Sequence, residues 1–450
     1  MNRAVTALLS CLGLMGGLVV APAAVEGARV SCARTTLVSV AHQDDDLLFV
    51  NPDLSRDYDR GACLRVVYLT AGDAGRAGDY VRSRENGVRA AYAVMAGAPD
   101  TWRRSDLRAG GRRLRAYSLV KPPNGRGDIQ LVFMGLPDGF PKGGGSAVYG
   151  RQSLLKLFRG GHGRITTVDG SARYDEETLI AVLRGLIQRF RPDVIRTLDH
   201  HSTRLGYSTT ESVDHSDHAV TARYTLLAAR HAMAASPGLR PELAFYRTYG
   251  ISALPANLTL DERIRKRAIF EAYVGQVTCG PGGCGAAPPR VGASESAWVA
   301  RQYRRESPAP VEGTIVSWAG STTAPNDDSA TGRCLAVRDG PSARDVVRTY
   351  ACDGTRAQGW YAKGATLRSA MDGRCLTAAG RAPRVAACDG SRRQRWALTT
   401  AGQVSTARGC LRQDDLLRRR ARLRVAACDR REPGQRWFHA VGRAARPPAP

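Results

Sequence analysis

The chain has 450 residues, of which 43% are hydrophobic, and a formal net charge of +25 at pH 7. This length allows two or three domains of about 100–200 residues each, and the hydrophobic content is that of a folded protein rather than a disordered one. Most of the positive charge is arginine spread along the whole chain, and no nucleic-acid-binding motif is recognisable. We therefore expect no specific nucleic-acid partner, although a basic surface would attract anionic polymers.

The N-terminal segment has the layout of a secretory signal peptide. Arg3 precedes a long apolar run that ends in small residues near Ala24 and Ala28. We assign residues 1–28 to this signal and expect a secreted, extracellular protein with no later membrane span. Removing Cys11 with the signal leaves ten of the 11 cysteines, an even number that suits disulfides in an oxidising compartment.

Strand-like and helix-like segments alternate between residues 35 and 275. Apolar, β-rich runs predict strands at 35–42, 63–72, 128–136 and 193–199, and helical periodicity predicts helices at 82–97, 175–190 and 215–234. This alternation predicts an α/β domain with a Rossmann-like, mostly parallel sheet and helices on both faces. Ligands of such sheets bind beyond the carboxyl ends of the strands, so His42, Asp138 and Asp199 should gather at one edge.

A change in composition marks the end of this domain. Between residues 276 and 328 the chain is rich in Gly, Pro, Ala, Ser and Thr, which is typical of loops and linkers. We assign residues 29–310 to the first domain, with disulfides Cys32–Cys63 and Cys279–Cys284, and residues 311–328 to a linker.

The remaining chain repeats itself with a period of about 40 residues. The stretches GRCLAV, GRCLTA and RGCLRQ are each followed by a second cysteine and a Gln-x-Trp ending. Three such units resemble the ricin-type β-trefoil lectin domain, which implies an all-β domain at residues 329–440 and a disordered tail at 441–450. The expected disulfides within the repeats are Cys334–Cys352, Cys375–Cys388 and Cys410–Cys428, and the tryptophans expected in a shared core are Trp360, Trp396 and Trp437.

Sugar binding by this domain is left open. Sugar-binding trefoils commonly carry Asp just after the Cys-Leu pair of each repeat, and these positions hold Ala336, Thr377 and Arg412 here. Tyr350 is the only aromatic residue just before the second cysteine of a repeat. The basic run at 416–424 is an alternative binding element for an anionic polymer, or a solvated rim. A polysaccharide is thus a possible partner of the trefoil.

The stretch VAHQDDDLLFV at 40–50 places a histidine and three aspartates between two apolar runs. Burying unpaired carboxylates is costly, so this arrangement predicts a partner for them. His42 and Asp45 are three residues apart and can share one metal ion, and the stretch DHSDH at 214–218 can supply a third ligand. Histidine and carboxylate ligands with an open position suit catalytic zinc.

The AHQDDD stretch and the later HSDH resemble the PIG-L/LmbE family of zinc-dependent de-N-acetylases. The matches VRSRE at 81–85 and GLPDG at 135–139 extend this resemblance over roughly residues 35 to 305. The family includes enzymes that deacetylate N-acetylglucosaminyl-phosphatidylinositol and the mycothiol precursor. The resemblance implies one Zn²⁺ ion held by His42, Asp45 and His218. It implies Asp44 as the general base and His215 as the general acid or oxyanion stabiliser, with Asp217 orienting His215. It also implies that Arg82 and Asp138 contact the substrate.

Three positions depart from the family pattern. Gln43 replaces a usual Pro, Asp46 replaces a usual Glu, and Val213 stands where some members carry Tyr. None of these is a proposed ligand, so we expect the chemistry to survive. We expect Asp46 to cap the following helical turn and Tyr207 to be the candidate replacement for the missing tyrosine.

These observations favour a secreted hydrolase that removes an N-acyl group, acetyl by the resemblance, from an N-acetylglucosamine-type sugar or glycan. It would act on linear amides other than peptide bonds, and its trefoil would target carbohydrate or polymer. The alternative is a lectin-like, carbohydrate-binding protein with a non-catalytic α/β domain. The complete set of His and Asp residues in both motifs argues against this alternative.

Overall fold

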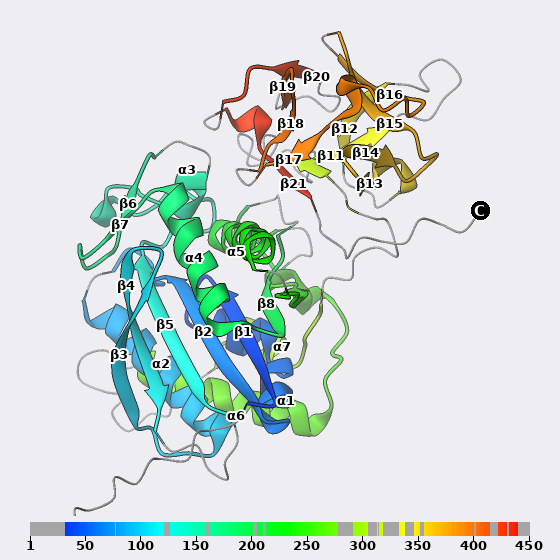
Figure 1. Cartoon of the computed structure of the whole chain (residues 1–450). Helices are drawn as coiled ribbons and strands as arrows, with labels where there is room; N and C mark the ends of the chain where they lie inside the picture. Colours follow the sequence, from blue (N-terminus) through cyan, green and yellow to red (C-terminus); the bar gives the residue numbers. More distant parts are fainter. Residues whose placement is uncertain are drawn as a thin grey trace, which may run out of the picture.

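The computed structural model of the chain consists of a sheet domain and a smaller all-β domain (Figure 1). The predicted signal peptide, the Cys279–Cys284 pair and the tail at 441–450 lie outside the described residues. The structure describes residues 32–76, 78–120, 127–158, 162–200, 205–209, 213–236, 238–277, 291–304, 313, 315–317, 333–337, 346–351, 355–380, 382–399, 402–414, 422–429 and 432–439.

A seven-stranded sheet forms the centre of the first domain, in the order β3-β4-β5-β2-β1-β8-β9. The neighbours from β5 to β9 are parallel, and β4 and β3 extend the sheet as an antiparallel hairpin. This arrangement confirms the predicted, mostly parallel α/β fold. The strands are β1 (Arg34–Val40), β2 (Ala62–Thr70), β3 (Trp102–Ala109), β4 (Arg112–Leu119), β5 (Ile129–Leu136), β8 (Val194–Leu198) and β9 (Glu242–Tyr246), with a separate pair β6 (Ile165–Thr166) and β7 (Arg173–Tyr174).

Helices cover both faces of this sheet, as predicted. In β1, Leu37 joins the apolar cluster of α4 and α5, whereas Val38 and Val40 pack with α2 and α6, because alternate side chains of a strand face opposite sides. No helix in the described part of the chain has both the length and the apolar character needed to cross a bilayer. The helices are α1 (Asp53–Asp59), α2 (Asp79–Ala96), α3 (Leu154–Phe158), α4 (Glu176–Phe190), α5 (Ser216–Ala235), α6 (Leu260–Val277) and α7 (Ala293–Val299).

The β3–β4 hairpin has no clear signal in the sequence. β3 carries Arg103, Arg104 and Arg108 at exposed positions, so few of its residues show the apolar alternation by which a strand is recognised. Charged side chains are common on edge strands because they discourage pairing with another chain. The same residues that hide β3 from pattern reading therefore suit its place at the edge of the sheet.

A buried lysine holds the segment that follows the three aspartates. This segment forms a short π-helix, η1 (Asp46–Val50). Lys266 of α6 is 1% exposed, and its Nζ donates to three carbonyl oxygens, those of Leu48 at 2.6 Å, Trp298 at 3.0 Å and Arg301 at 2.7 Å. One side chain thus ties η1 to α6 and to the end of α7.

The second domain is built from three four-stranded antiparallel sheets, as expected for a β-trefoil. In each repeat the indole nitrogen of the Gln-x-Trp tryptophan donates to the carbonyl of the leucine that follows the first cysteine, in the pairs Trp360–Leu335, Trp396–Leu376 and Trp437–Leu411. The strands are β10 (Ile315–Ser317), β11 (Arg333–Val337), β12 (Val347–Ala351), β13 (Trp360–Lys363), β14 (Thr366–Ser369), β15 (Cys375–Ala379), β16 (Ala382–Ala386), β17 (Ala397–Leu398), β18 (Val404–Thr406), β19 (Gly409–Gln413), β20 (Leu423–Ala426) and β21 (Trp437–His439).

The cysteine pattern is present in the described residues. Disulfides Cys375–Cys388 and Cys410–Cys428 close the second and third repeats, and Cys32–Cys63 ties the start of the first domain to β2. Cys334 is also disulfide-bonded, while Cys352 lies outside the described residues.

β10 pairs with β11 and β21, so the trefoil begins inside the segment assigned to a linker.

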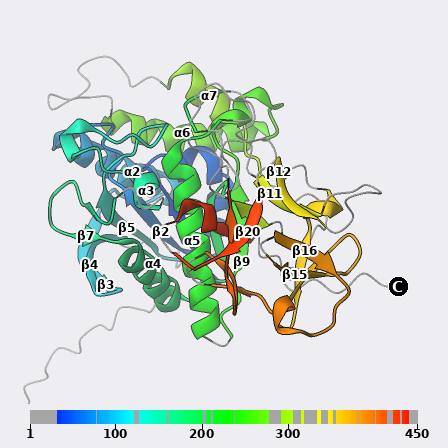
Figure 2. The same cartoon turned by 90° about the horizontal axis from the view of Figure 1, so that it is seen from above.

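An ion pair joins the two domains. Arg436, just before β21, donates to Glu176 Oε1 at 2.9 Å and Oε2 at 3.2 Å, and its guanidinium lies 5.2 Å from the Phe158 ring centroid. The Arg436 side chain is 8% exposed, and a bidentate pair shielded from water is stronger than an exposed one. Because Glu176 begins α4 and Phe158 ends α3, the trefoil lies against the α3–α5 side of the first domain (Figures 1 and 2).

Replacing Lys266 by Met should preserve the side-chain volume but leave three buried carbonyl oxygens without their donor. We expect the free energy of unfolding to fall by about 2–4 kcal/mol, measured by chemical denaturation followed by circular dichroism. The exposed Lys142→Met is a matched control and should change stability by less than about 0.5 kcal/mol. Equal losses for the two variants would mean that Lys266 does not hold these segments.

Candidate metal centre

Three segments bring the motif residues together at the carboxyl edge of the sheet. Residues 42–46 follow β1, Asp138 follows β5, and His215 and His218 lie at the start of α5. In the sheet β1 and β5 are separated only by β2, so residues far apart in the sequence meet where parallel sheets bind their ligands. Asp199, which follows β8, is also buried.

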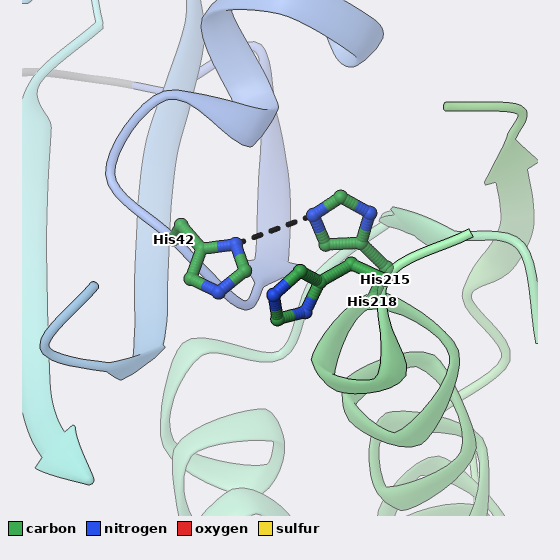
Figure 3. Close-up of side chains that lie close together, drawn as sticks. All are labelled: His42, His215 and His218. Carbon is green, nitrogen blue, oxygen red and sulfur yellow. Dashed lines mark hydrogen bonds between the residues drawn. The ribbon is translucent and has the colours of Figure 1, made fainter. Parts of the chain in front are cut away.

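The three predicted metal ligands converge on one point. His218 Nε2 lies 2.8 Å from Asp45 Oδ1 and 3.2 Å from His42 Nδ1, and His42 Nδ1 lies 3.5 Å from Asp45 Oδ2. Tetrahedral zinc, with bonds of about 2.0–2.2 Å, would hold its ligand atoms roughly 3.3–3.5 Å apart. Figure 3 shows the imidazole rings of His42 and His218 turned toward each other, with His215 beside them.

The hydrogen bonds around these ligands fit a cation. His218 Nδ1 lies 2.7 Å from Asp214 Oδ1, which places the ring proton on Nδ1 and leaves Nε2 as a lone pair. That lone pair faces both His42 Nδ1 and the Asp45 carboxylate. Asp214 is itself held by the Thr248 hydroxyl at 2.5 Å. A divalent cation at this point would pair with all three ligand atoms, so the residues fit a zinc ion.

Asp45 also shapes the loop that carries it. Its Oδ2 accepts the backbone N–H of Ala41 at 3.1 Å and of His42 at 2.7 Å. These bonds fold residues 41–45 into a tight turn, so that the histidine and the carboxylate face the same point. The carboxylate therefore both builds the turn and offers its second oxygen to a metal.

The protein groups alone shift the ligands' pKa values strongly. Burial lowers the pKa of His218, but Asp45 and Asp214 outweigh it and raise that pKa to about 9. Burial likewise acts against the charged form of His42, yet Asp45 and Asp217 raise its pKa well above the usual value. Burial would raise the pKa of Asp45, but His218 and His42 hold it well below its ordinary range. Positive charge is therefore favoured at this point, whether as protons or as a metal ion.

Asp44 differs from its neighbours in facing outward. Its side chain is 28% exposed, against 3% for Asp45. Arg84 of α2 donates from Nη2 to Asp44 Oδ1 at 2.5 Å and from Nη1 to the Gly72 carbonyl at 3.1 Å. Asp44 is thus fixed beside the ligands at the accessible side of the site.

Arg84 was not singled out by the sequence, which pointed instead to Arg82. The Arg82 side chain is 69% exposed and pairs with Asp79 one turn earlier on α2. Arg84 is only 8% exposed. Both arginines belong to the stretch at 81–85, so the motif located the right segment, and the structure brings Arg84 rather than Arg82 to Asp44.

His215 is held as a neutral hydrogen-bond donor. Its Nδ1 accepts the backbone N–H of Asp217 at 3.1 Å, so its proton sits on Nε2, which lies 3.6 Å from Asp138 Oδ1. Burial and the neighbouring His42 lower the pKa of His215 well below the usual value, against the opposing effect of Asp138. Among the described residues, His42, His215 and His218 offer ring nitrogens close enough to share one ion, and His42, Asp138, His215 and Asp217 form an overlapping group of possible metal ligands.

The Asp217 carboxylate lies nearer to His42 than to His215. Its Oδ2 accepts the Gly139 N–H at 2.7 Å, is 3.6 Å from His42 Nε2 and 3.8 Å from His215 Nδ1. Through its carboxylate, Asp217 orients His42 and the loop after β5, while its backbone orients His215. Asp138 in the same loop accepts the Phe140 N–H at 2.8 Å.

The expected capping role of Asp46 is wrong. No side-chain hydrogen bond caps η1, and Asp46 is fully buried, where its Oδ2 accepts the hydroxyl protons of Tyr68 and Tyr92. Burial raises the pKa of Asp46 to about 7, although the two phenols lower it. The carboxylate points into the domain because β2 and α2 both place a tyrosine there.

A tyrosine near the ligands escaped the sequence analysis. Tyr249, in the 3-10 helix η4 (Tyr249–Ala253), has its ring centroid 5.0 Å from that of His218. Burial, together with Asp45 and Asp214, raises the pKa of Tyr249 well above its usual value. Tyr207, the candidate predicted from the sequence, is 57% exposed and lies against Tyr249 with a centroid distance of 4.9 Å.

His200 does not join the described ligand groups. It is buried and packs on Phe245 with ring centroids 4.2 Å apart, and its carbonyl accepts the Arg223 Nε proton at 2.8 Å. His200 therefore packs between β9 and α5, next to the end of β8. His201 lies outside the described residues.

Replacing Asp46 by Asn should change how stability depends on pH. Because the folded-state pKa of Asp46 is raised above its unfolded value, wild type loses stability as pH rises from about 4 to 7. The amide cannot ionise, so between pH 5 and 8 the variant should gain about 2–3 kcal/mol relative to wild type. Denaturant unfolding across this pH range measures the difference, and a pH-independent difference would contradict the buried-acid assignment.

Comparison with family models finds two matches in this chain. Residues 37–229 match the model described as GlcNAc-PI de-N-acetylase, PIG-L, and residues 326–437 match the ricin-type beta-trefoil lectin domain. No curated protein sequence matches the chain.

Several solved structures are similar at low identity. The A40926 pseudoaglycone deacetylase Dbv21 is 15% identical, over 56% of this chain and 86% of that chain, with a TM-score of 0.30. The zinc inhibited form of teicoplanin deacetylase Orf2 is 16% identical, over 53% and 83%, with a TM-score of 0.27. A non-toxic homologue of type II RIPs from Momordica charantia, in complex with α-methyl-D-galactoside, is 19% identical, over 28% and 47%, with a TM-score of 0.23. The chain thus spans about half the length of this last protein.

The two family models match the two domains that the structure describes. The first covers the sheet from β1 to α5 and includes both metal-ligand motifs, and the second covers the three Trp-Leu repeats. The chain therefore contains a PIG-L de-N-acetylase domain at residues 37–229 and a ricin-type β-trefoil lectin domain at residues 326–437.

Proposed function

We propose that the first domain is a zinc-dependent hydrolase that removes an N-acetyl group from an N-acetylglucosamine-type sugar or glycan. The observation that carries this proposal is the convergence of His42, Asp45 and His218 on one point, with Asp44 at its accessible side. The PIG-L match supports de-N-acetylation as the reaction. The secretory layout of residues 1–28 and the disulfides support an extracellular protein.

His42 Nδ1, Asp45 Oδ1 and His218 Nε2 would hold the ion, and Asp214 and Asp217 would orient the two histidines. Bound Zn²⁺ would polarise the amide carbonyl and make water a stronger acid. The ligands are buried, whereas Asp44 is partly exposed, so substrate would enter past Asp44.

Asp44 would accept the proton of the attacking water. A carboxylate held beside the reacting atoms can act as a general base, and Arg84 fixes its orientation. The neutral His215 would donate from Nε2 to the developing oxyanion. Its Nδ1 already accepts a backbone proton, which supports the role of oxyanion stabiliser over that of a charged acid.

The proposed substrate contacts divide into two groups. Asp138 lies inside the site beside His215, so it can position the substrate or His215. Arg82 points to solvent and would reach only a large substrate. Tyr249 and Tyr207 form an aromatic surface next to His218 and could take the position of the tyrosine that Val213 replaces.

The alternative, a lectin-like protein with a non-catalytic sheet domain, is less well supported. Such a domain would have no need to bury two histidines around Asp45 or to hold Asp44 at the accessible side. Buried charges of this kind are costly to fold, and the trefoil lacks the usual aspartate in all three repeats.

The purified protein should release acetate from N-acetylglucosamine or its oligosaccharides, lose this activity in a strong chelator and regain it with zinc. Asp44→Asn should still bind one zinc ion per chain but lose about 10²–10⁴-fold in turnover, because the amide cannot accept a proton. Acetate release and metal content by mass spectrometry measure the two properties. Chelator-insensitive release, or near wild-type turnover by zinc-loaded Asp44→Asn, would contradict the proposal.

Arg84→Ala should lower kcat/KM by about 10–100-fold, because Asp44 loses the group that positions it. Arg82→Ala is the matched control from the same helix and removes the same charge from an exposed position. It should stay within about twofold of wild type on small substrates. If both variants lost activity equally, positioning by Arg84 would not explain the effect.

A further inference from the structure

The three trefoil repeats carry an arginine at one equivalent position. Each is four residues before the second cysteine of its repeat, and the strand register places it directly opposite the residue that follows Cys-Leu. The three cross-strand pairs are Ala336–Arg348, Thr377–Arg384 and Arg412–Arg424. The place where sugar-binding trefoils commonly present a carboxylate thus faces a guanidinium in every repeat.

These arginines lie on the outer face of their hairpins. In β16, Pro383 and Val385 on either side of Arg384 are buried, while Arg384 is exposed, because alternate residues of a strand face opposite sides. Arg424 of β20 is exposed in the same way and Arg348 of β12 is half-buried. The core of the trefoil therefore does not use them.

The second repeat concentrates positive charge around its arginine. Gln394 donates from Nε2 to Thr377 Oγ1 at 3.2 Å, directly across from Arg384, and so brings η6 (Arg392–Gln394) next to this pair. Arg384, Arg392, Arg393 and Arg395 are all exposed, and none forms a salt bridge with a carboxylate of the described residues. We call these four residues the second-repeat arginine cluster.

At the equivalent position of the third repeat, neighbouring acids neutralise the arginine. Arg424 and Arg412 both contact Asp414 Oδ1, at 2.9 and 3.2 Å, and Arg412 also lies 3.4 Å from Glu432. Arg384 thus lacks, among the described residues, the carboxylate partner that Arg424 has at the equivalent position. Figures 1 and 2 both show β15 and β16 on the side of the trefoil away from the sheet domain, where a large ligand can reach them.

The trefoil as a whole is strongly basic. Residues 329–440 contain 23 Lys and Arg against 9 Asp and Glu, a net charge of +14 in a chain with +25 overall. Among the described residues, none of the large apolar side chains classed as exposed lies in the trefoil.

We propose that the trefoil binds an anionic polysaccharide, one that carries sulfate, phosphate or carboxylate groups, chiefly through the second-repeat arginine cluster. Guanidinium groups bind such anions through paired hydrogen bonds. The choice of polysaccharide over nucleic acid rests on the proposed action of the first domain on amino sugars. The observations that support an anion site come from the trefoil alone and do not depend on that proposed function.

The test uses the full-length protein and two polymers that differ only in charge, dextran and dextran sulfate. We expect binding to dextran sulfate that weakens steeply with added salt and no binding to dextran. Arg384→Ala should weaken dextran sulfate binding about tenfold. Arg424→Ala, which removes the same charge from the equivalent position next to Asp414, should change it less than about twofold.

Other outcomes would overturn the proposal. Equal binding to dextran would mean that charge is not recognised, and equal losses for Arg384→Ala and Arg424→Ala would mean that net charge alone, not the cluster, is responsible. Duplex DNA that displaces dextran sulfate at equal charge concentration would favour nucleic acid instead. Thermal melting checks that both variants fold. Because binding is measured without turnover, loss of the proposed deacetylase activity would leave this result unchanged.

Discussion

The first domain depends on one buried contact, in which His218 Nε2 meets His42 Nδ1 and Asp45 Oδ1. These groups come from the turn after β1 and from the first turn of α5, and all are nearly inaccessible to water. Removing them from water is costly, and the cost is recovered only when opposite charges lie close together. Asp214 and Asp217 add two more buried carboxylates around the two histidines. Negative groups therefore outnumber the imidazoles, and a divalent cation is the simplest way to balance them.

The same constraint explains how three consecutive aspartates can sit between apolar segments. Each finds a different partner: Asp44 pairs with Arg84, Asp45 with the two histidines, and Asp46 with two phenols. The turn and π-helix at this point direct neighbouring side chains to different sides. Lys266 of α6 then holds the π-helix in place by donating a hydrogen bond to the Leu48 carbonyl oxygen. A carboxylate at any of the three positions is thus tolerable only because of residues distant in the sequence.

Residue type explains why part of the site could be predicted from the sequence. A metal ion accepts few ligand types, so a histidine and aspartates after a strand, with a second histidine pair at a helix start, predicted His42, Asp45 and His218 as ligands, and the structure brings these three side chains together. Arg84 could not be found in this way, because Arg82 and Arg84 differ only in their rotation on α2, by about 200° at 100° per residue. Which of them faces the site is decided by how α2 packs on α6, where the Arg84 guanidinium lies 5.9 Å from the Tyr273 ring centroid.

Tyr249 and the β3–β4 hairpin escaped prediction for other reasons. Tyr249 lies in an irregular connection after β9 and is placed by Thr248, which bonds to Asp214, and by stacking on Trp298. No periodicity marks such a contact. In β3 the exposed arginines conceal the alternation. Asp46 was misassigned because a capping residue and a buried acid look alike in sequence, and only the two tyrosines of β2 and α2 distinguish them.

The trefoil shows how a scaffold can keep its fold while its binding positions change. The Trp-Leu bonds recur in all three repeats because each tryptophan closes the shared core. The outward positions face no such demand and differ between repeats. Arg384 of the second repeat has no carboxylate partner among the described residues. In the third repeat Asp414 pairs with Arg424 and Arg436 contacts Glu176. Because that contact fixes the third repeat against α4, it leaves the second repeat pointing outward. The orientation of the trefoil and the exposure of the second-repeat arginine cluster are therefore linked through the way the repeats use their arginines.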